Sequence, residues 1–373
     1  MKVLVTGGAG FIGSHTVDAL VEKGHEVTIL DSLEKPVHLS GMPEYLNKDA
    51  RFVQGDVRNR EDFLKALEGV EAVFHFAAYQ DYLTDFSKFF SVNAVGTALL
   101  YELIVEKRLP VKKVIVASSQ AVYGEGKCVC KCMDDGTFIY PDIRKEEDLR
   151  AGNWEIPCPR CRGPLSPLET GETTVNPQNQ YAVSKCSQEM VALNIGRRYS
   201  LPTVILRYSI VQGPRQSFHN AYSGACRVFA LSLYLGKSPP IYEDGAQLRD
   251  YVNIEDVVRA NMLVFSDERA DYKVFNVGGG RRHTVLELYR AVAKALKSRV
   301  EPRLDNRYRF GDTRHIISDI SRLKSIGWEP LNGIDKSVAA YAGWLKKQDG
   351  IADMLDYAKA NMERQGVVRR AAV

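Results

Sequence analysis

The chain has 373 residues, of which 45% are hydrophobic and 26% charged, a composition typical of a globular protein with room for two domains. Its net charge of +4 is spread along the sequence, so we expect no nucleic-acid partner. No uninterrupted apolar run reaches the ~20 residues of a membrane-spanning helix, and glycines follow Thr6, where a signal peptide would need its apolar core. We therefore expect a cytoplasmic protein without membrane contact, whose seven cysteines serve a purpose other than disulfide bonding.

The beginning of the chain is typical of a dinucleotide-binding site. Residues 2–6 are apolar enough for a buried strand, and residues 11–23 have the apolar periodicity of a helix. Glycines between them would permit a tight turn, a close approach of the backbone to a pyrophosphate, and close packing of helix on strand. The N-terminus of the helix would then face the phosphates. The predicted cofactor contacts in this stretch are Gly7, Gly10, Phe11, Ile12 and Gly13.

An acidic residue after the second strand indicates which dinucleotide binds. Residues 26–30 predict a strand that leads into Asp31, eighteen residues beyond Gly13. A carboxylate there accepts hydrogen bonds from both ribose hydroxyls and would repel the 2′-phosphate of NADP, so we predict NAD as the cofactor. The alternative is a tight turn followed by a solvated aspartate. The succession of strand, turn, helix, strand and acid favours the cofactor site.

Strands and helices alternate through the first half of the chain, which predicts an α/β fold with a doubly wound parallel sheet and ligands beyond the carboxyl ends of its strands. Asp56 follows the third strand, where its carboxylate would accept the exocyclic amine of adenine; an exposed loop aspartate is the alternative. Ala77 and Ala78 would let the backbone pass under the cofactor. His75 is interpreted as a core histidine. The further elements expected in this half are strands 51–54, 72–76 and 113–117 and helices 61–68 and 85–107.

A tyrosine and a lysine are predicted to do the chemistry. Tyr181 and Lys185 lie four residues apart in a predicted helix over residues 180–199, so they are neighbours on one face. A nearby ammonium lowers the pKa of a phenol, which would let Tyr181 accept a substrate hydroxyl proton, while Ser119, just after the fifth strand, holds the same oxygen. Such a pair is usually structural, but its place downstream of the glycine turn favours catalysis.

These motifs resemble those of the extended short-chain dehydrogenase/reductases that act on nucleotide sugars. The resemblance extends to about Lys347 and includes several motifs of the second half. They are Leu206-Arg-Tyr, Gly213-Pro214, Gln247-Leu-Arg249-Asp-Tyr-Val, Phe275-Asn-Val-Gly278, Arg309-x-Gly-Asp312 and Ile326-Gly-Trp-Glu-Pro330. Ile210 and Gln212 stand where the family usually has Asn and Tyr.

The resemblance implies a nucleotide-diphosphate sugar as substrate and a homodimer formed through the Tyr181 helix. It implies that Arg249 and Arg309 bind the diphosphate, that Asn220 donates to it, and that Tyr242 contacts the base. Ordinary surface arginines are the alternative for the arginine pair. The cofactor contacts that it implies beyond the glycine turn are Asp31, Asp56, Val57, Ala77, Ala78, Asn93, Ser118, Tyr181 and Lys185.

Within the family, the chain is most similar to the dTDP-L-rhamnose 4-epimerases, in the stretches 213–224, 243–245 and 311–315. This likeness implies oxidation to a 4-keto sugar and return of the hydride to the opposite face by NAD. A UDP-hexose or UDP-uronate 4-epimerase is one alternative, and a non-catalytic dinucleotide sensor is another. Gln120 and Ala121 stand where dehydratase relatives carry acids, which disfavours dehydration.

An insertion over residues 125–175 holds five of the seven cysteines. A Cys-x-x-Cys pair followed by glycine forms a tight knuckle whose thiolates converge on one ion, and an upstream pair completes a tetrahedron. Because protein would fill all four positions, a zinc ion there would fold the insertion without taking part in chemistry. A disulfide, a redox pair and reduced surface thiols are the alternatives. The predicted zinc ligands are Cys130, Cys132, Cys158 and Cys161.

Two interleaved domains are expected. The dinucleotide-binding domain comprises residues 1–207 and 252–277, with residues 252–261 and 273–277 returning to the main sheet. A smaller C-terminal lobe of residues 208–251 and 278–347 would close over the sugar, and residues 284–298 predict one of its amphipathic helices. The tail, residues 348–373, has a helix-like stretch at 352–364 and is interpreted as a surface helix or a frayed end.

Overall fold

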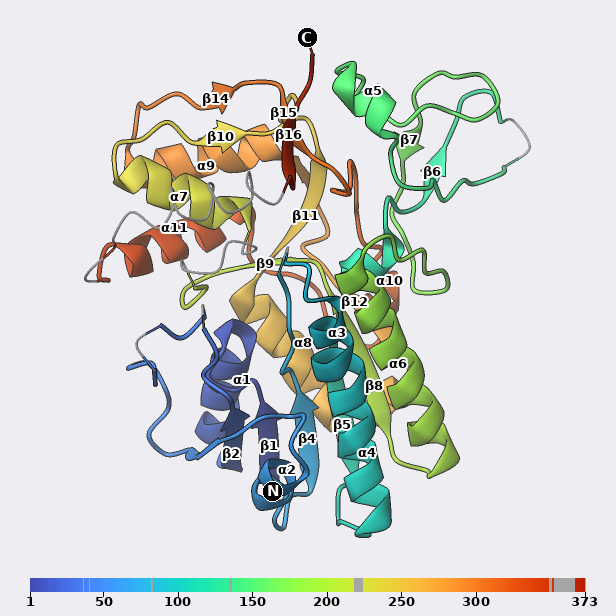
Figure 1. Ribbon diagram of the computed structural model, residues 1–373. Helices are drawn as coiled ribbons and strands as arrows, with labels where there is room; N and C mark the ends of the chain where they lie inside the picture. Colours follow the sequence, from blue (N-terminus) through green and yellow to red (C-terminus); the bar gives the residue numbers. More distant parts are fainter. Residues whose placement is uncertain are drawn as a thin grey trace.

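A seven-stranded parallel sheet forms the centre of the protein, in the order β12-β8-β5-β4-β1-β2-β3 (Figure 1). The computed structural model describes residues 1–372 except 36, 40, 82, 134–135, 218–223, 349–350 and 352–365. The predicted doubly wound parallel sheet is confirmed. Its strands are β1 (Lys2–Thr6), β2 (Glu26–Asp31), β3 (Arg51–Gln54), β4 (Ala72–His75), β5 (Lys113–Ser119), β8 (Thr203–Tyr208) and β12 (Val274–Val277).

Helices cover both faces of this sheet, which explains why its strands are apolar on both sides. Along β1, Val3 and Val5 belong to one buried cluster and Leu4 to the other, because successive side chains of a strand point to opposite faces. α1 (Phe11–Glu22) and α8 (Ile254–Ser266) cover the first face. The second is covered by α2 (Arg60–Ala66), α4 (Gly96–Glu106) and α6 (Gln180–Arg198).

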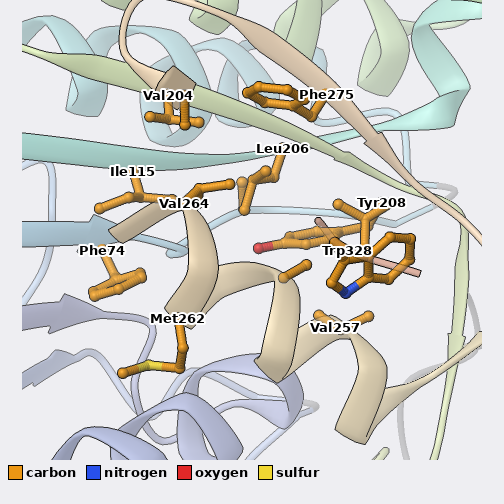
Figure 2. Packing of buried hydrophobic residues seen from close by; sticks show 14 of the residues in the cluster. Phe74, Ile115, Val204, Leu206, Tyr208, Val257, Met262, Val264, Phe275 and Trp328 are labelled. Atoms are coloured by element: carbon orange, nitrogen blue, oxygen red, sulfur yellow. The ribbon is translucent and has the colours of Figure 1, made fainter. Parts of the chain in front are cut away.

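The cluster beneath α8 joins helix and sheet into one core. Trp328 closes one end of it, and its indole N–H donates to the Asp256 carbonyl at 3.0 Å, so the ring is both buried and hydrogen-bonded. Figure 2 shows these side chains together: Val257, Met262 and Val264 from α8, and Phe74, Ile115, Val204, Leu206, Tyr208 and Phe275 from the strands.

The predicted helix over residues 85–107 is interrupted by a π-helical turn, Ser91–Val95, between α3 (Phe86–Phe90) and α4. Among the described helices, the segment Phe86–Glu106 is the one with the length and composition to cross a membrane, which the sequence was not expected to contain. Half of its apolar window is buried within the protein, and it packs against α6. We therefore interpret it as a core helix.

The smaller lobe is built from its own sheets and helices. Residues 252–261 were expected to return to the main sheet; they add no strand to it, but they do pack on its first face. The chain finishes β11 (Leu248–Asn253) and continues as α8, which the Asn253 side chain caps by accepting from the Glu255 N–H at 2.8 Å. Thr284 and Glu287 form a capping box at the start of α9, the predicted amphipathic helix. The elements of the lobe are β9 (Ile210–Gln212), α7 (Ala225–Tyr234), β10 (Pro240–Ile241), β11 (Leu248–Asn253), β13 (Arg282–Thr284), α9 (Val285–Leu296), β14 (Arg303–Leu304), β15 (Arg307–Arg309) and α11 (Ile334–Leu345).

The insertion stands beside this lobe, at the upper right of Figure 1. The end of the chain is tied to both, so the interpretation of a frayed end is wrong for its described residues. β16 (Val368–Arg370) pairs with β15, and the Ala372 N–H donates to the Arg150 carbonyl of the insertion at 2.9 Å. The helix-like stretch at 352–364 lies outside the described residues. The remaining elements are η2 (Gln120–Tyr123), β6 (Cys128–Val129), α5 (Glu146–Arg150), β7 (Ser166–Pro167), η3 (Glu268–Ala270) and α10 (Ser321–Lys324).

A buried ion pair links α6 to the sheet. The Arg207 guanidinium donates to both oxygens of Glu189, at 2.9 and 2.6 Å, and both side chains are about 95% buried. Arg207 also donates to the Tyr123 hydroxyl and the Glu172 carbonyl. Glu189 also accepts from the Ser118 hydroxyl near the end of β5, so the pair supports the edge of the sheet where ligands are expected.

Replacing Glu189→Gln should lower the stability of the fold. The amide keeps the shape of the side chain but leaves the Arg207 charge buried without its counter-ion, a change that costs about 3–5 kcal/mol. We expect the urea midpoint to fall clearly below that of the wild type. Glu102→Gln is the matched control, since Glu102 pairs with Arg60 on the surface and its loss should leave the midpoint unchanged. Equal midpoints for the two variants would contradict this assignment.

Candidate active site

A cavity of 930 Å³ opens beyond the carboxyl ends of the strands, between the main sheet and the smaller lobe. Of the predicted catalytic, cofactor and substrate residues that the structure describes, Asn93 is the one that is not in its wall, and it lies behind it. Asn220 lies outside the described residues. The predicted residues that line it together are Gly7, Gly10, Phe11, Ile12, Gly13, Asp31, Asp56, Val57, Ala77, Ala78, Ser118, Ser119, Tyr181, Lys185, Tyr242, Arg249 and Arg309.

The glycine turn has no room for side chains. A Cβ on Gly13 would lie 2.2 Å from the Gly7 carbonyl oxygen, and one on Gly7 would lie 2.7 Å from the Ala77 nitrogen. Gly7 also has a φ of +68°, which favours glycine. Gly10 is the N-cap of α1, and no side chain caps the helix there. The N-terminus of α1 therefore presents its N–H groups to the cavity, as a pyrophosphate requires.

The two acidic cofactor candidates differ in how their carboxylates are held. Asp31 accepts from the Ala9 N–H at 3.0 Å and from the Leu33 N–H at 2.9 Å, so backbone donors orient it at the end of β2. Asp56 is instead bound by the Arg58 side chain, whose Nε lies 2.9 Å from Oδ1. Hydrogen bonding to Arg58 holds the pKa of Asp56 below its usual value despite partial burial. Both carboxylates line the cavity, and Asp31 fits a ribose diol better because protein side chains use less of it.

The catalytic candidates come from the end of β5 and the start of α6. Asn179 begins α6 by accepting from the Ala182 N–H at 2.9 Å, which places Tyr181 in the first turn and Lys185 one turn later. Burial lowers the pKa of Lys185 to about 7, an effect that the Glu189 carboxylate opposes. Ser119 ends β5, and its Oγ accepts from the Ala121 N–H at 3.1 Å.

Lys185 is joined to the core through a line of buried hydrogen bonds. Its Nζ donates to Gln188 at 2.5 Å, Gln188 donates to Thr97 at 2.8 Å, and Thr97 lies 3.0 Å from Nε2 of His75. Nδ1 of His75 lies 2.8 Å from the Thr6 hydroxyl. Burial lowers the pKa of His75 to about 3, so it is a neutral core histidine, as expected.

Asn93 supports the cavity wall from behind. Its amide accepts from the Tyr79 N–H at 2.8 Å and donates to the Tyr79 carbonyl at 3.0 Å. It also donates to the Ser184 hydroxyl at 2.9 Å. These bonds fix the segment that follows Ala78. Asn93 reaches this segment from the π-helical turn Ser91–Val95. Such turns are frequent at functional sites.

The two arginines predicted to bind a diphosphate are held in different ways. Arg249 donates to the backbone carbonyls of Leu248, Thr313 and Arg314 at 2.6–2.9 Å. Three of its five N–H groups are thus used by described residues, which leaves two for an anion. Arg309 pairs with Asp312 at 2.6 Å and lies over the Tyr242 ring, 5.2 Å from its centroid.

Two further cavity residues are absent from the predicted site. Arg227 of α7 is only 1% exposed, and burial lowers its pKa. A charged residue within the apolar helical stretch 225–234 is the sequence signal by which it could have been found. Gln120 is 7% exposed, and its Oε1 has no partner among the described residues. It stands beside Ser119, where a sugar hydroxyl would supply the missing hydrogen bond.

The insertion brings four thiols together. Sγ of Cys132 lies 3.3 Å from that of Cys130 and 3.6 Å from that of Cys158, and Cys130 lies 3.5 Å from Cys161. All four sulfur atoms are within 4.8 Å of one another. The fifth cysteine, Cys128, is buried in the apolar core of the insertion, where burial raises its pKa to about 12.

The model of the NAD dependent epimerase/dehydratase family matches residues 3–141 and 161–278. The chain belongs to this family. It is 32% identical to the dTDP-L-rhamnose 4-epimerase of Burkholderia thailandensis, over 93% of this chain and 95% of the relative. The UDP-glucose 4-epimerase of Thermotoga maritima, solved with UDP-glucose, is 30% identical, with a TM-score of 0.72 over 93% of this chain and 99% of its own. That of Thermus thermophilus, solved with NAD, is 29% identical, with the same TM-score and coverage.

The protein is therefore an NAD-dependent enzyme of the nucleotide-sugar epimerase and dehydratase family. The geometry of the glycine turn fits this cofactor, since it opens a helix N-terminus towards the cavity and places a backbone-held carboxylate at the end of β2. Between its two matched segments, the family model leaves out residues 142–160, which lie within the insertion.

Replacing Gly13→Ala should remove the cofactor. The added Cβ would lie 2.2 Å from the Gly7 oxygen, so α1 must move away from β1 and the phosphate-binding turn opens. We expect the NAD released on heat denaturation of the purified protein to fall by roughly tenfold, measured by chromatography. Gly343→Ala in α11, where no atom lies within 4 Å of the new Cβ, should keep the wild-type NAD content. A Gly13 variant with full NAD would refute this reading of the turn.

Proposed function

We propose that the protein is a 4-epimerase acting on dTDP-L-rhamnose. The observation that carries this proposal is the gathering of Ser119, Tyr181 and Lys185 in the same cavity as the glycine turn and Arg249. The 32% identity to a dTDP-L-rhamnose 4-epimerase supports the choice of sugar. A non-catalytic dinucleotide sensor would not need the complete set of proton-transfer residues.

In the proposed mechanism, Tyr181 removes the proton from the C4 hydroxyl and later returns it to the C4 oxygen. Lys185, one helical turn away, favours the phenolate form, and Ser119 donates a hydrogen bond to the same oxygen. Bound NAD supplies reversible hydride transfer at C4. Because the same proton acceptor serves both directions, inversion requires only that the keto sugar present its other face, with no net oxidation.

The residues beside Ser119 favour epimerisation over dehydration. Loss of water from a sugar needs an acid that protonates the departing hydroxyl. Gln120 and Ala121 follow Ser119, and neither side chain can donate a proton in this way. The buried Oε1 of Gln120, which lacks a partner among the described residues, suits a neutral hydrogen bond to a sugar hydroxyl.

A UDP-hexose or UDP-uronate 4-epimerase is the second candidate. The similarity to the Thermotoga maritima enzyme solved with UDP-glucose supports a hexose. The buried guanidinium of Arg227 in the cavity wall supports a uronate, because it would pair with the sugar carboxylate. The same proton-transfer residues would serve either sugar, so the two candidate functions are distinguished by which nucleotide sugar the protein converts.

We expect the purified protein, without added cofactor, to convert dTDP-L-rhamnose into its C4 epimer. Proton NMR of the anomeric signals would follow the reaction, with UDP-glucose and UDP-glucuronate incubated in parallel. Tyr181→Phe keeps the ring and removes the proton acceptor, so its turnover should fall by at least about a hundredfold. Conversion of one UDP-sugar alone would select the second candidate. Full activity of Tyr181→Phe would refute the mechanism, and no conversion of any sugar after addition of NAD would refute all three substrates.

We also propose that the insertion binds one structural zinc ion through Cys130, Cys132, Cys158 and Cys161. The support is geometric: the nearest sulfur atoms are 3.3–3.6 Å apart, close to the edge of about 3.8 Å of a tetrahedron with 2.3 Å zinc–sulfur bonds. The Arg160 N–H lies 3.4 Å from Sγ of Cys158, and such donors favour a thiolate. Four protein ligands leave no position for substrate.

Elemental analysis of the purified protein should find about one zinc per chain. Cys161→Ser should lose the metal, because a hydroxyl is a poor replacement for one of four thiolates. Cys128→Ser is the matched control, and its zinc content should stay at the wild-type level. A fully folded, active wild type without zinc would overturn the proposed metal site, and loss of zinc in the Cys128 variant alone would overturn the choice of ligands.

A further inference from the structure

The four clustered cysteines lie close in sequence to a carboxylate that contacts the smaller lobe. Glu155 precedes Cys158 by three residues. Its Oε1 accepts from the Arg314 side chain at 3.0 Å (Nε) and 2.5 Å (Nη2). Its Oε2 lies 3.0 Å from Nε2 of His315. One residue of the insertion thus holds two successive residues of the lobe.

Arg314 is the centre of this contact. It is fully buried, and the Asp244 carboxylate accepts from it at 2.7 and 2.9 Å. Glu243 accepts from it at 2.9 Å and also from Arg144 of the insertion at 2.8 and 3.0 Å. Arg314, Arg144 and Glu243 are buried, whereas the Glu155 and Asp244 side chains are 44% and 43% exposed at the edge of the network. A buried guanidinium needs its partners in place, so the network ties the insertion to the lobe.

The backbone around Arg314 in turn orients Arg249. The carbonyls of Thr313 and Arg314 accept from the Arg249 guanidinium at 2.6 and 2.8 Å. The Arg314 N–H donates to Glu125, at the start of the insertion, at 2.6 Å. Nδ1 of His315 accepts from the Leu248 N–H at 3.1 Å, next to Arg249 in β11. Any shift of the 313–315 backbone would therefore turn the guanidinium that faces the cavity.

We propose that Glu155 is a positioning residue for the nucleoside diphosphate, and that the zinc-bound insertion acts through it. The zinc ion fixes the knuckle, the knuckle fixes Glu155, and Glu155 holds Arg314 so that Arg249 presents its two remaining donors to the phosphates. The inference rests on the proposed nucleotide-sugar and zinc sites. The family match leaves out residues 142–160, which contain both Arg144 and Glu155, so this support comes from a part of the chain outside the family model.

The cofactor site gives a built-in control. The glycine turn and Asp31 lie on the main sheet, and the contacts of Glu155 are to the lobe. Glu155 is also not one of the four proposed zinc ligands, which are all cysteines. Its replacement should therefore weaken the binding of a nucleoside diphosphate and leave the NAD and zinc contents unchanged. A general loss of structure would lower all three.

The test is calorimetric titration of dTDP and of UDP into the NAD- and zinc-containing protein. We expect Glu155→Ala to raise the Kd of the nucleotide that the wild type binds by about tenfold, because a misplaced guanidinium loses its paired contact with phosphate. Glu155→Gln keeps an acceptor for Arg314 and should recover part of the affinity. Glu147→Ala, an exposed carboxylate of the same insertion, should match the wild type. During turnover, the rise should appear in KM, with kcat within about twofold.

A Kd for Glu155→Ala within about twofold of the wild type, with zinc and NAD retained, would overturn the proposal. If that variant does not fold, Cys161→Ser provides the second arm: loss of zinc should raise the Kd by a similar factor while NAD stays bound, and an unchanged Kd would again overturn it. Binding needs no turnover, so failure of epimerisation does not obscure the result. A wild type that binds neither nucleotide would instead refute the proposed substrate class, and this inference with it.

Discussion

The close approach of α1 to the end of β1 is the contact on which the site depends. It leaves 2.2 Å between the Gly7 oxygen and any Cβ on Gly13, so backbone alone can occupy the turn. In the same turn, the Ala9 N–H donates to Asp31, which joins the turn proposed to bind the phosphates to the carboxylate proposed to bind the ribose. One steric constraint therefore sets the positions of both, and it explains why three glycines stand where side chains would otherwise pack.

Behind the cavity, buried polar groups determine the position of Lys185, the proposed catalytic lysine. The Thr6 hydroxyl accepts from the Ala77 N–H and contacts His75, and the line continues through Thr97 and Gln188 to Lys185. Thr97 donates to the Asn93 carbonyl, so its oxygen is an acceptor for His75, which assigns the proton to Nε2 of the ring. The backbone at Ala77, which lines the cavity, and Lys185 thus belong to one network of hydrogen bonds. Such networks impose a single arrangement because each unpaired member would be costly.

In the smaller lobe, hydrogen bonds and ion pairs likewise determine how the arginines are oriented. Arg249 reaches the cavity with three donors already committed to backbone carbonyls, which holds its planar group in one orientation. Two of these carbonyls belong to the segment around Arg314, which donates hydrogen bonds to Glu125 and Glu155 of the insertion. The C-terminal strand β16 pairs with β15, which carries Arg309. Residues 142–160 of the insertion and the end of the chain lie outside the family match. Both contact the segments that carry the residues proposed to bind phosphate.

Sequence alone determined the features that depend on residues close together in the chain. These features are the two-sided apolar runs of β1 and β5, the glycine turn, the spacing of Tyr181 and Lys185, and the spacing within each of the two cysteine pairs. Each depends on residues near one another in the chain, so periodicity and spacing are enough to find them. Tertiary structure decided the rest. Residues 254–261 became a helix over the sheet because Asn253 caps them, Asn93 moved behind the wall in a π-helical turn, and residues 368–370 paired with β15. The ion network of Glu155 and Arg314 joins residues 159 positions apart, and nothing in a charge pattern says which distant charges will pair.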